Sequence, residues 1–242
     1  MDNKVIAALD MADMNKVRQL VETLGDTIDF YKVGMELFYS VGAAAIEYLR
    51  SCNKKVFLDL KLHDIPNTVE QGIGALVELR PTLITVHASG GRAMLQAAVR
   101  AAAQRAEVLG IPRPKIIAIT VLTSINDQEW TVLGGTSPIS EQVVRLAQLA
   151  QDTGIDGVVA SPQEAAAIRA ACGREFLIIT PGIRPQGAAV NDQSRTATPA
   201  AALAAGADYL VIGRPITQAT FPAAAAADIL QEVEDYLCSQ QK

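Results

Sequence analysis

Short apolar runs alternate along this chain with longer segments in which apolar residues return every three or four positions. The first run, Val5 to Leu9, is short and β-prone, which predicts a buried strand. In the next segment, apolar residues from Val17 to Leu24 fall at positions i, i+3, i+4 and i+7, and Asp13 stands where a helix N-cap is expected. The opening segment therefore predicts a strand followed by an amphipathic helix.

The same alternation continues to the end of the chain. The apolar runs predict strands over Val5 to Leu9, Phe30 to Val33, Val56 to Leu60, Leu83 to His87, Ile116 to Leu122, Gly157 to Ala160, Phe176 to Thr180, and Tyr209 to Ile212. Helical patterns follow them around Val17 to Leu24, Ala43 to Leu49, Val69 to Leu76, Met94 to Val108, Val143 to Leu149, after Ser161, after Thr198, and around Ile229 to Leu237. Longer loops are expected over Thr123 to Pro138, with a helical turn near Trp130, and over Pro181 to Ser194.

Eight strand–helix units without a composition break or a linker are typical of one α/β domain, a (β/α)8 TIM barrel. We expect this single domain to span residues 1–242. The hydrophobic fraction of 50% is ample for its core. In such barrels the active site lies at the carboxyl ends of the strands.

Composition narrows the classes of partner. The formal net charge of −5 disfavours binding to nucleic acid or to an anionic membrane. No apolar run approaches the roughly 20 residues of a membrane span, and the amino terminus does not resemble a signal peptide. Three cysteines without metal-type spacing indicate reduced thiols. We therefore expect a cytoplasmic protein.

Charged residues crowd the end of the third predicted strand. Asp59 and Lys61 lie two positions apart, so strand alternation predicts that their side chains point the same way. Asp64 follows, and Pro66 suits the first position of a helix. Charges at the end of a buried strand are costly unless they pair or take part in chemistry. An ion pair that merely closes the strand end is the alternative.

The ends of the other strands add polar groups at the same end of the predicted barrel. Asp10, Lys32, His87 and Thr123 follow or end their strands. The Pro181-Gly182-Ile183-Arg184 turn and Gly213-Arg214 follow strands seven and eight, where barrels commonly bind phosphate through backbone amides and a helix start. A turn with a solvated arginine is the alternative for Gly213-Arg214, but its place in the barrel favours phosphate.

The decapeptide from Asp59 to Thr68, DLKLHDIPNT, resembles the signature of the orotidine 5'-phosphate decarboxylase family, in its bacterial form. Further agreement runs in order from Asp10 to Arg214, which is nearly the whole chain. The decapeptide is specific, whereas the glycine–arginine pieces are weak by themselves. The resemblance implies decarboxylation of orotidine 5'-phosphate to uridine 5'-phosphate, the last step of UMP biosynthesis, without a cofactor or a metal.

The resemblance also implies a role for each matching residue. Lys61 would donate the proton that replaces the carboxylate on C6 of the pyrimidine, and Asp59 would lie against that departing carboxylate. Lys32 and Asp64 would complete an alternating network of lysines and aspartates. Asp64, Ile65 and Thr68 would reach into the site of a neighbouring subunit in a homodimer with shared active sites.

Substrate binding follows from the same comparison. Asp10 and Lys32 would hold ribose hydroxyls, and Thr123, with Ser124 beside it, would contact the pyrimidine. The phosphate would be bound by Arg184, Gln193, Gly213 and Arg214, partly through closure of the loop around Gln193.

Chemistry independently favours the lysine as the central group. Decarboxylation without an electron sink develops a carbanion, which a fixed cation such as Lys61 stabilises more in the transition state than in the ground state. By strand alternation His63 faces away from Lys61, which favours a structural role. His87 ends a strand, where contact with a ligand and a structural role are both open.

Two other functions remain as alternatives. A magnesium-dependent sugar-phosphate decarboxylase or aldolase on a related barrel also uses an Asp-x-Lys-x-x-Asp run, with the carboxylates on the metal. Pro66-Asn67-Thr68 and the long loop around Gln193 favour the nucleotide enzyme. A catalytically silent barrel that only binds a phosphosugar is the second alternative, and the intact Lys61 with both flanking aspartates argues against it.

Overall fold

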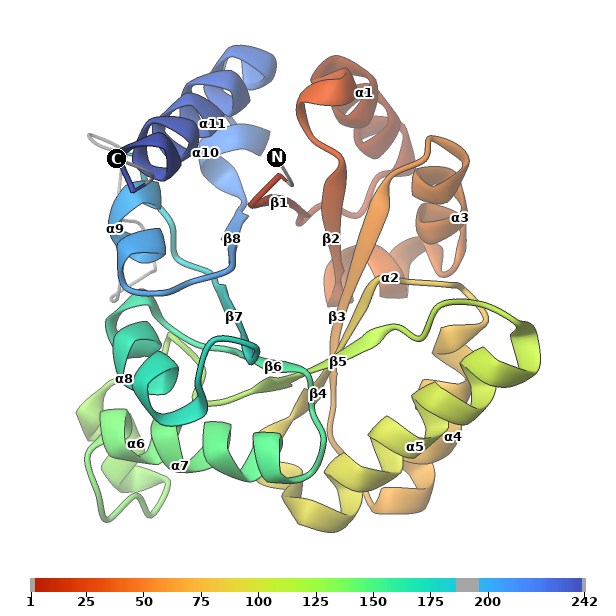
Figure 1. Cartoon of the computed structure of the whole chain (residues 1–242). Coiled ribbons are helices and arrows are strands. Elements are labelled where there is room, and N and C mark those ends of the chain that lie inside the picture. Colours follow the sequence, from red (N-terminus) through yellow and green to blue (C-terminus); the bar gives the residue numbers. More distant parts are fainter. Residues whose placement is uncertain (1–2, 186–195, 241–242) are drawn as a thin grey trace.

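The computed structural model describes residues 3–185 and 196–240. Eight parallel strands form a closed barrel in chain order, with β1 paired to β8, and helices surround it (Figure 1). This confirms the predicted single-domain (β/α)8 barrel. The strands are β1 (Val5–Leu9), β2 (Phe30–Gly34), β3 (Lys55–Leu62), β4 (Leu83–His87), β5 (Lys115–Ile119), β6 (Gly157–Val159), β7 (Leu177–Thr180) and β8 (Tyr209–Ile212).

Several α-helices begin at residues that favour a helix start. Asp13 accepts a hydrogen bond from the backbone amide of Asn15, and Pro66 occupies the first turn of its helix. Ser161 and Thr198 cap two further helices in the same manner as Asp13. The helices are α1 (Met14–Leu24), α2 (Met35–Val41), α3 (Ala44–Ser51), α4 (Pro66–Val77), α5 (Gly91–Leu109), α6 (Asp127–Val132), α7 (Ile139–Asp152), α8 (Pro162–Cys172), α9 (Pro199–Ala204), α10 (Arg214–Thr217) and α11 (Pro222–Ser239).

The core has an inner and an outer part. One cluster of buried side chains draws only on the strands and fills the barrel, with Phe30, Phe57 and Ile117 among its members. The outer clusters join the other faces of the strands to the helices, as Ile73 of α4 and Ile229 of α11 do. Parallel strands covered on both faces need apolar side chains on both, which explains the continuous apolar runs in the sequence.

The structure corrects some predicted boundaries. β5 ends at Ile119 rather than at Leu122, so the last three residues of the predicted strand belong to the loop above the barrel. β3 runs on to Leu62 instead of ending at Leu60, and its pairing with β4 shifts register between Leu58 and Leu62. A short helix, α2, follows β2 directly and was not expected.

Arginine–aspartate pairs close the amino-terminal end of the barrel. Asp208 precedes β8, accepts the backbone amide of Ile178 in β7, and pairs with Arg169. The Arg169 guanidinium also donates to the carbonyl oxygens of Gly173, Arg174, Phe176 and Gly206. Asp156 repeats the arrangement before β6, where it accepts the amide of Ile116 and pairs with Arg113. Charges at this end therefore join neighbouring strands.

Candidate active site

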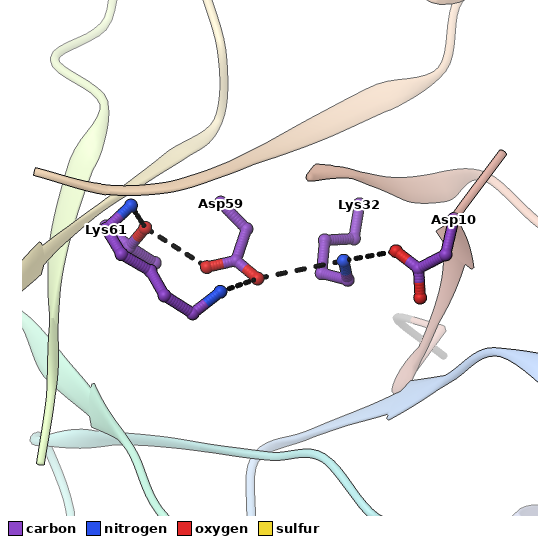
Figure 2. A network of polar contacts seen from close by, with 5 residues as sticks. Asp10, Lys32, Asp59 and Lys61 are labelled. Carbon is purple, nitrogen blue, oxygen red and sulfur yellow. Dashed lines mark hydrogen bonds and ion pairs between the residues drawn. The ribbon is translucent and has the colours of Figure 1, made fainter. Parts of the chain in front are cut away.

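Four charged side chains of alternating sign lie in a row across the carboxyl end of β1, β2 and β3. Figure 2 shows them in the order Lys61, Asp59, Lys32 and Asp10. Asp59 Oδ2 lies 2.9 Å from Lys61 Nζ and 3.7 Å from Lys32 Nζ. Lys32 Nζ lies 2.8 Å from Asp10 Oδ1. The row thus places one buried carboxylate between two ammonium groups.

Burial differs along this row. Asp59 is 7% exposed, whereas the side chain of Lys61 is 25% exposed and that of Asp10 is 59% exposed. The carboxylate of Asp59 is therefore shielded from water, and its attraction to the two lysines is correspondingly strong. The partly open ammonium of Lys61 can still meet a ligand that enters from the rim.

Lys61 adopts an unusual backbone conformation. Its φ angle is +56°, in the left-handed region that residues with a side chain rarely occupy. It lies within the register shift between β3 and β4, and its backbone amide donates to Thr85 Oγ1 at 2.8 Å. The contact between Asp59 and Lys61 confirms that both side chains lie on the same side of the strand, but an irregular strand, rather than regular alternation, brings them together.

Thr85 of β4 is the site residue that sequence reasoning missed. It is fully buried, and its hydroxyl group donates to Asp59 Oδ1 at 3.1 Å. The only available signal was one polar residue inside the apolar run Leu83 to His87, next to the strand that holds the charged motif.

A small, mainly apolar chamber adjoins the charged row. Its volume is about 170 Å³. Phe57, Ile119 and Val211 line it together with the polar groups of Lys61 and Thr123. The chamber can enclose a small ring, and Lys61 and Thr123 are among the residues that would contact it. Thr123, predicted to contact the pyrimidine, is one of the lining residues.

A second, more polar cavity of about 440 Å³ lies beside the chamber. Asp10, Arg184, Gly213 and Arg214 line it, and Lys32 lines both cavities. Arg184 is 9% exposed and donates to the carbonyl oxygen of its neighbour Ile183. Two arginines beside an open backbone turn suit a phosphate group. Gln193, predicted to share this role, lies outside the described residues.

The position of Lys32 depends on the lack of a side chain at Gly34. A Cβ atom on Gly34, at the end of β2, would lie 2.9 Å from Lys32 Nζ and 3.5 Å from Asp10 Oδ1. The ammonium of Lys32 therefore occupies the volume that any other residue at position 34 would fill.

The residues predicted to act across a subunit interface lie on the surface of the chain and line neither cavity. Asp64, Ile65 and Thr68 are exposed, and the apolar side chain of Ile65 is 66% exposed. Asp64 Oδ1 accepts a hydrogen bond from the backbone amide of Ile65. Within one chain the structure thus brings Asp59, Lys61, Lys32 and Asp10 together, but not Asp64 or Thr68.

Two histidines lie beside the site. The ring centroids of His63 and His87 lie 5.2 Å apart, and the two ring planes are tilted by 33°. Burial lowers the pKa of His87, and the nearby His63 and Lys61 lower it further, against an opposing effect of Asp59. His87 lines neither of the two cavities described above.

No group of three or more His, Cys, Asp or Glu side chains in the part of the chain that the structure describes could hold a metal ion. No helix among residues 3–185 and 196–240 is both long enough and apolar enough to span a membrane.

The chain is similar to known proteins over nearly its whole length. The model of the family described as "Orotidine 5'-phosphate decarboxylase / HUMPS family" matches residues 3–229. The orotidine 5'-phosphate decarboxylase of Moorella thermoacetica is 50% identical over 233 residues, 96% of this chain and 92% of that protein. The enzyme of the same name from Trichlorobacter lovleyi is 49% identical over 231 residues, 96% of this chain and 95% of that protein.

A solved structure shares both sequence and fold. The crystal structure of orotidine 5'-phosphate decarboxylase from Lactobacillus acidophilus matches with a TM-score of 0.83 at 42% identity. The match covers 96% of this chain and 99% of that chain. Because the family model spans nearly the whole sequence and relatives about half identical do the same, the chain belongs to the orotidine 5'-phosphate decarboxylase / HUMPS family.

Proposed function

We propose that the protein converts orotidine 5'-phosphate to uridine 5'-phosphate and carbon dioxide, the final step of UMP biosynthesis, with Lys61 as proton donor. The observation that carries the proposal is the Lys61 ammonium, held 2.9 Å from the buried Asp59 carboxylate at the wall of an apolar chamber. The names of the relatives support the same substrate.

The reaction has a simple electron balance. The bond between C6 and the carboxylate breaks, its electron pair stays on C6, and carbon dioxide leaves. The Lys61 ammonium then gives a proton to C6, and the neutral amine regains one from water. A cation held beside the developing carbanion stabilises the transition state more than the ground state, so the same group serves as electrostatic stabiliser and acid.

Asp59 has two effects in this scheme. Its Oδ2 atom orients the ammonium of Lys61 and is shared with Lys32. A substrate carboxylate bound near Lys61 also approaches the negative charge of Asp59, and loss of carbon dioxide removes that repulsion. The fixed charges are in place before the reaction, so little reorganisation is needed when the carbanion forms.

The polar cavity would receive the remainder of the nucleotide. Lys32, which lines both cavities, and Asp10, which lines the polar one, are placed to bind ribose hydroxyls. Arg184, Gly213 and Arg214 would bind the phosphate. Because the phosphate lies far from the reacting carbon, its binding energy can orient the ring and close the site, with Gln193 as the proposed loop contact.

A homodimer with shared sites completes the proposal. Asp64, Ile65 and Thr68 are exposed on the rim beside the site, and an isoleucine that is 66% exposed is suited to burial against another chain. In the proposed dimer these residues enter the site of the partner, where Asp64 extends the charged row. A cytoplasmic location, suited to a nucleotide-biosynthetic enzyme, stays a prediction.

An absorbance assay tests the function directly. Orotidine 5'-phosphate loses its characteristic ultraviolet absorbance on decarboxylation, so the purified protein is mixed with the substrate with and without a metal chelator. We expect turnover that the chelator does not reduce. Turnover abolished by the chelator would favour the magnesium-dependent alternative, and substrate-induced stabilisation without turnover would indicate a binding barrel.

A further inference from the structure

Thr85 is buried in β4 and contacts two members of the charged row, Asp59 and Lys61. Its side chain is 0% exposed, and β4 places it next to the irregular part of β3. Its hydroxyl group accepts the backbone amide of Lys61 at 2.8 Å. Because that amide is the donor in the first contact, the hydroxyl hydrogen is free to be donated to Asp59 Oδ1, 3.1 Å away.

These contacts form a closed circuit. It runs from the Lys61 amide to the Thr85 hydroxyl, then to one oxygen of Asp59, and from the other oxygen of Asp59 back to the Lys61 ammonium at 2.9 Å. The two oxygens of the carboxylate thus have different partners. With Oδ1 held by Thr85, rotation of the carboxylate is restricted, and Oδ2 stays directed at the lysines.

The circuit also compensates for the break in the sheet. Pairing of β3 with β4 shifts register between Leu58 and Leu62, and Lys61 has a φ angle of +56°. A buried backbone amide that lacks a ladder partner is costly unless another acceptor replaces it. The Thr85 hydroxyl provides that acceptor at a residue whose left-handed backbone conformation is itself unfavourable.

We propose that Thr85 is a positioning residue, which holds the Lys61 backbone and the Asp59 carboxylate in the geometry that proton donation requires. The proposal rests on the proposed function. Thr85 lines neither cavity, so it acts through Asp59 and Lys61 rather than on the substrate. A shared hydroxyl couples the two groups, so its loss affects both together.

The principal test replaces Thr85 by valine, which has nearly the same shape but no hydroxyl group. We expect kcat to fall by about 10- to 100-fold, the effect of one lost hydrogen bond to a charged group in the transition state. KM and the affinity for uridine 5'-phosphate should change by less than about threefold, because the binding cavities are untouched. Thr85→Ser, which keeps the hydroxyl group, should recover most of the wild-type kcat.

A matched control separates catalysis from stability. Thr153 is also buried, and its hydroxyl donates to the Ala150 carbonyl at the end of α7, at the amino-terminal end of the barrel. Thr153→Val should lower the melting temperature while kcat stays at the wild-type value. If Thr85→Val does not fold, Thr85→Ser can be compared with Thr85→Ala, because both variants lack the same methyl group. Only the serine variant keeps the hydroxyl group, so its kcat should exceed that of the alanine variant by the factor expected between wild type and Thr85→Val.

A second measurement does not depend on turnover. Amide hydrogen exchange at Lys61 should accelerate in Thr85→Val, whereas that of the neighbouring β4 amides should not. Folded Thr85→Val with wild-type kcat, or a serine variant as slow as the valine variant, would overturn the proposal. If the wild-type protein is inactive, the proposed function is rejected, and the circuit then has no role in catalysis. Active wild type with equally active Thr85→Val would reject the circuit alone.

Discussion

Lys61 Nζ lies 2.9 Å from Asp59 Oδ2, and the lysine is the more exposed member of this pair. Lys61→Ala therefore removes the proposed acid and the cation beside C6, while Asp59 keeps Lys32 as a partner at 3.7 Å. We expect decarboxylation to be abolished and the fold to persist, because alanine and lysine face the same backbone restriction at a positive φ angle. Single-turnover assays and circular dichroism measure the two effects.

Binding of the product provides the control for Lys61→Ala. The variant should still bind uridine 5'-phosphate, which calorimetry can measure, because the polar cavity proposed to bind the phosphate is intact. More than a few per cent of wild-type turnover in the variant would contradict the role of Lys61.

Arg214 should act through the phosphate. For Arg214→Ala we expect kcat/KM to fall by the equivalent of about 2–5 kcal/mol, the usual effect of removing one partner of a buried charge pair. Orotidine, which lacks the phosphate, should react equally slowly with wild type and variant. Arg145→Ala is a suitable control, since Arg145 forms an exposed pair with Glu141 on α7. Equal impairment on nucleoside and nucleotide would show that Arg214 has another role.

Asp64 tests the shared site by subunit exchange. Lys61→Ala and Asp64→Ala subunits are each expected to form inactive homodimers. A mixed dimer has one site that lacks both groups and one complete site, so activity should rise toward about a quarter of wild type per total site if pairing is random. Exchange verified by mass spectrometry without recovery would mean that Asp64 serves its own chain.

His87 should make stability depend on pH. Burial holds the pKa of His87 below its ordinary value of 6.5, with His63 and Lys61 acting in the same direction and Asp59 against them. Below pH 6.5 the unfolded chain takes up a proton that folded His87 resists, so stability is fully present above that pH and declines as the pH falls. His87→Asn should lose less stability than wild type between pH 7.5 and 5.5, as measured by urea denaturation. Equal losses would show that other groups cause the decline.

Arg169 should matter for stability and not for chemistry. Arg169→Leu removes the partner of Asp208 and the donor to four carbonyl groups, so the free energy of unfolding should fall by at least about 2 kcal/mol. The kcat of the folded fraction should stay at the wild-type value. Arg92→Leu provides a comparison, because the Arg92–Asp152 pair is about 60% exposed on both sides and should contribute less than about 1 kcal/mol.

Most of the fold follows from local sequence patterns. Apolar runs, with helix-start signals such as the N-cap Asp13 and the first-turn Pro66, located all eight strands and the principal helices, because barrel strands and their covering helices have different periodicities. The helix Met35–Val41 was not predicted, since it begins directly after β2 without a cap signal or a break in composition.

The site could be predicted where charged residues end a strand. It was harder to predict where the pairing between strands determines the conformation or the contacts of a residue. Asp59, Lys61, Lys32 and Asp10 are together as expected. The left-handed conformation of Lys61 depends on how β3 pairs with β4, which the sequence of β3 alone does not specify. Thr85 was missed for the same reason, because a single threonine in an apolar strand has no local signal of its partners.

Gly34 shows that a site can also depend on the absence of a side chain. Its backbone is extended, so other residues could adopt the conformation, but a Cβ atom would lie 2.9 Å from Lys32 Nζ. A lysine tail can swing aside at little cost to folding, so one added methyl group would displace a charge without unfolding the barrel. Gly34→Ala therefore offers a way to displace the Lys32 ammonium, which lines both cavities, while every ionisable residue is kept.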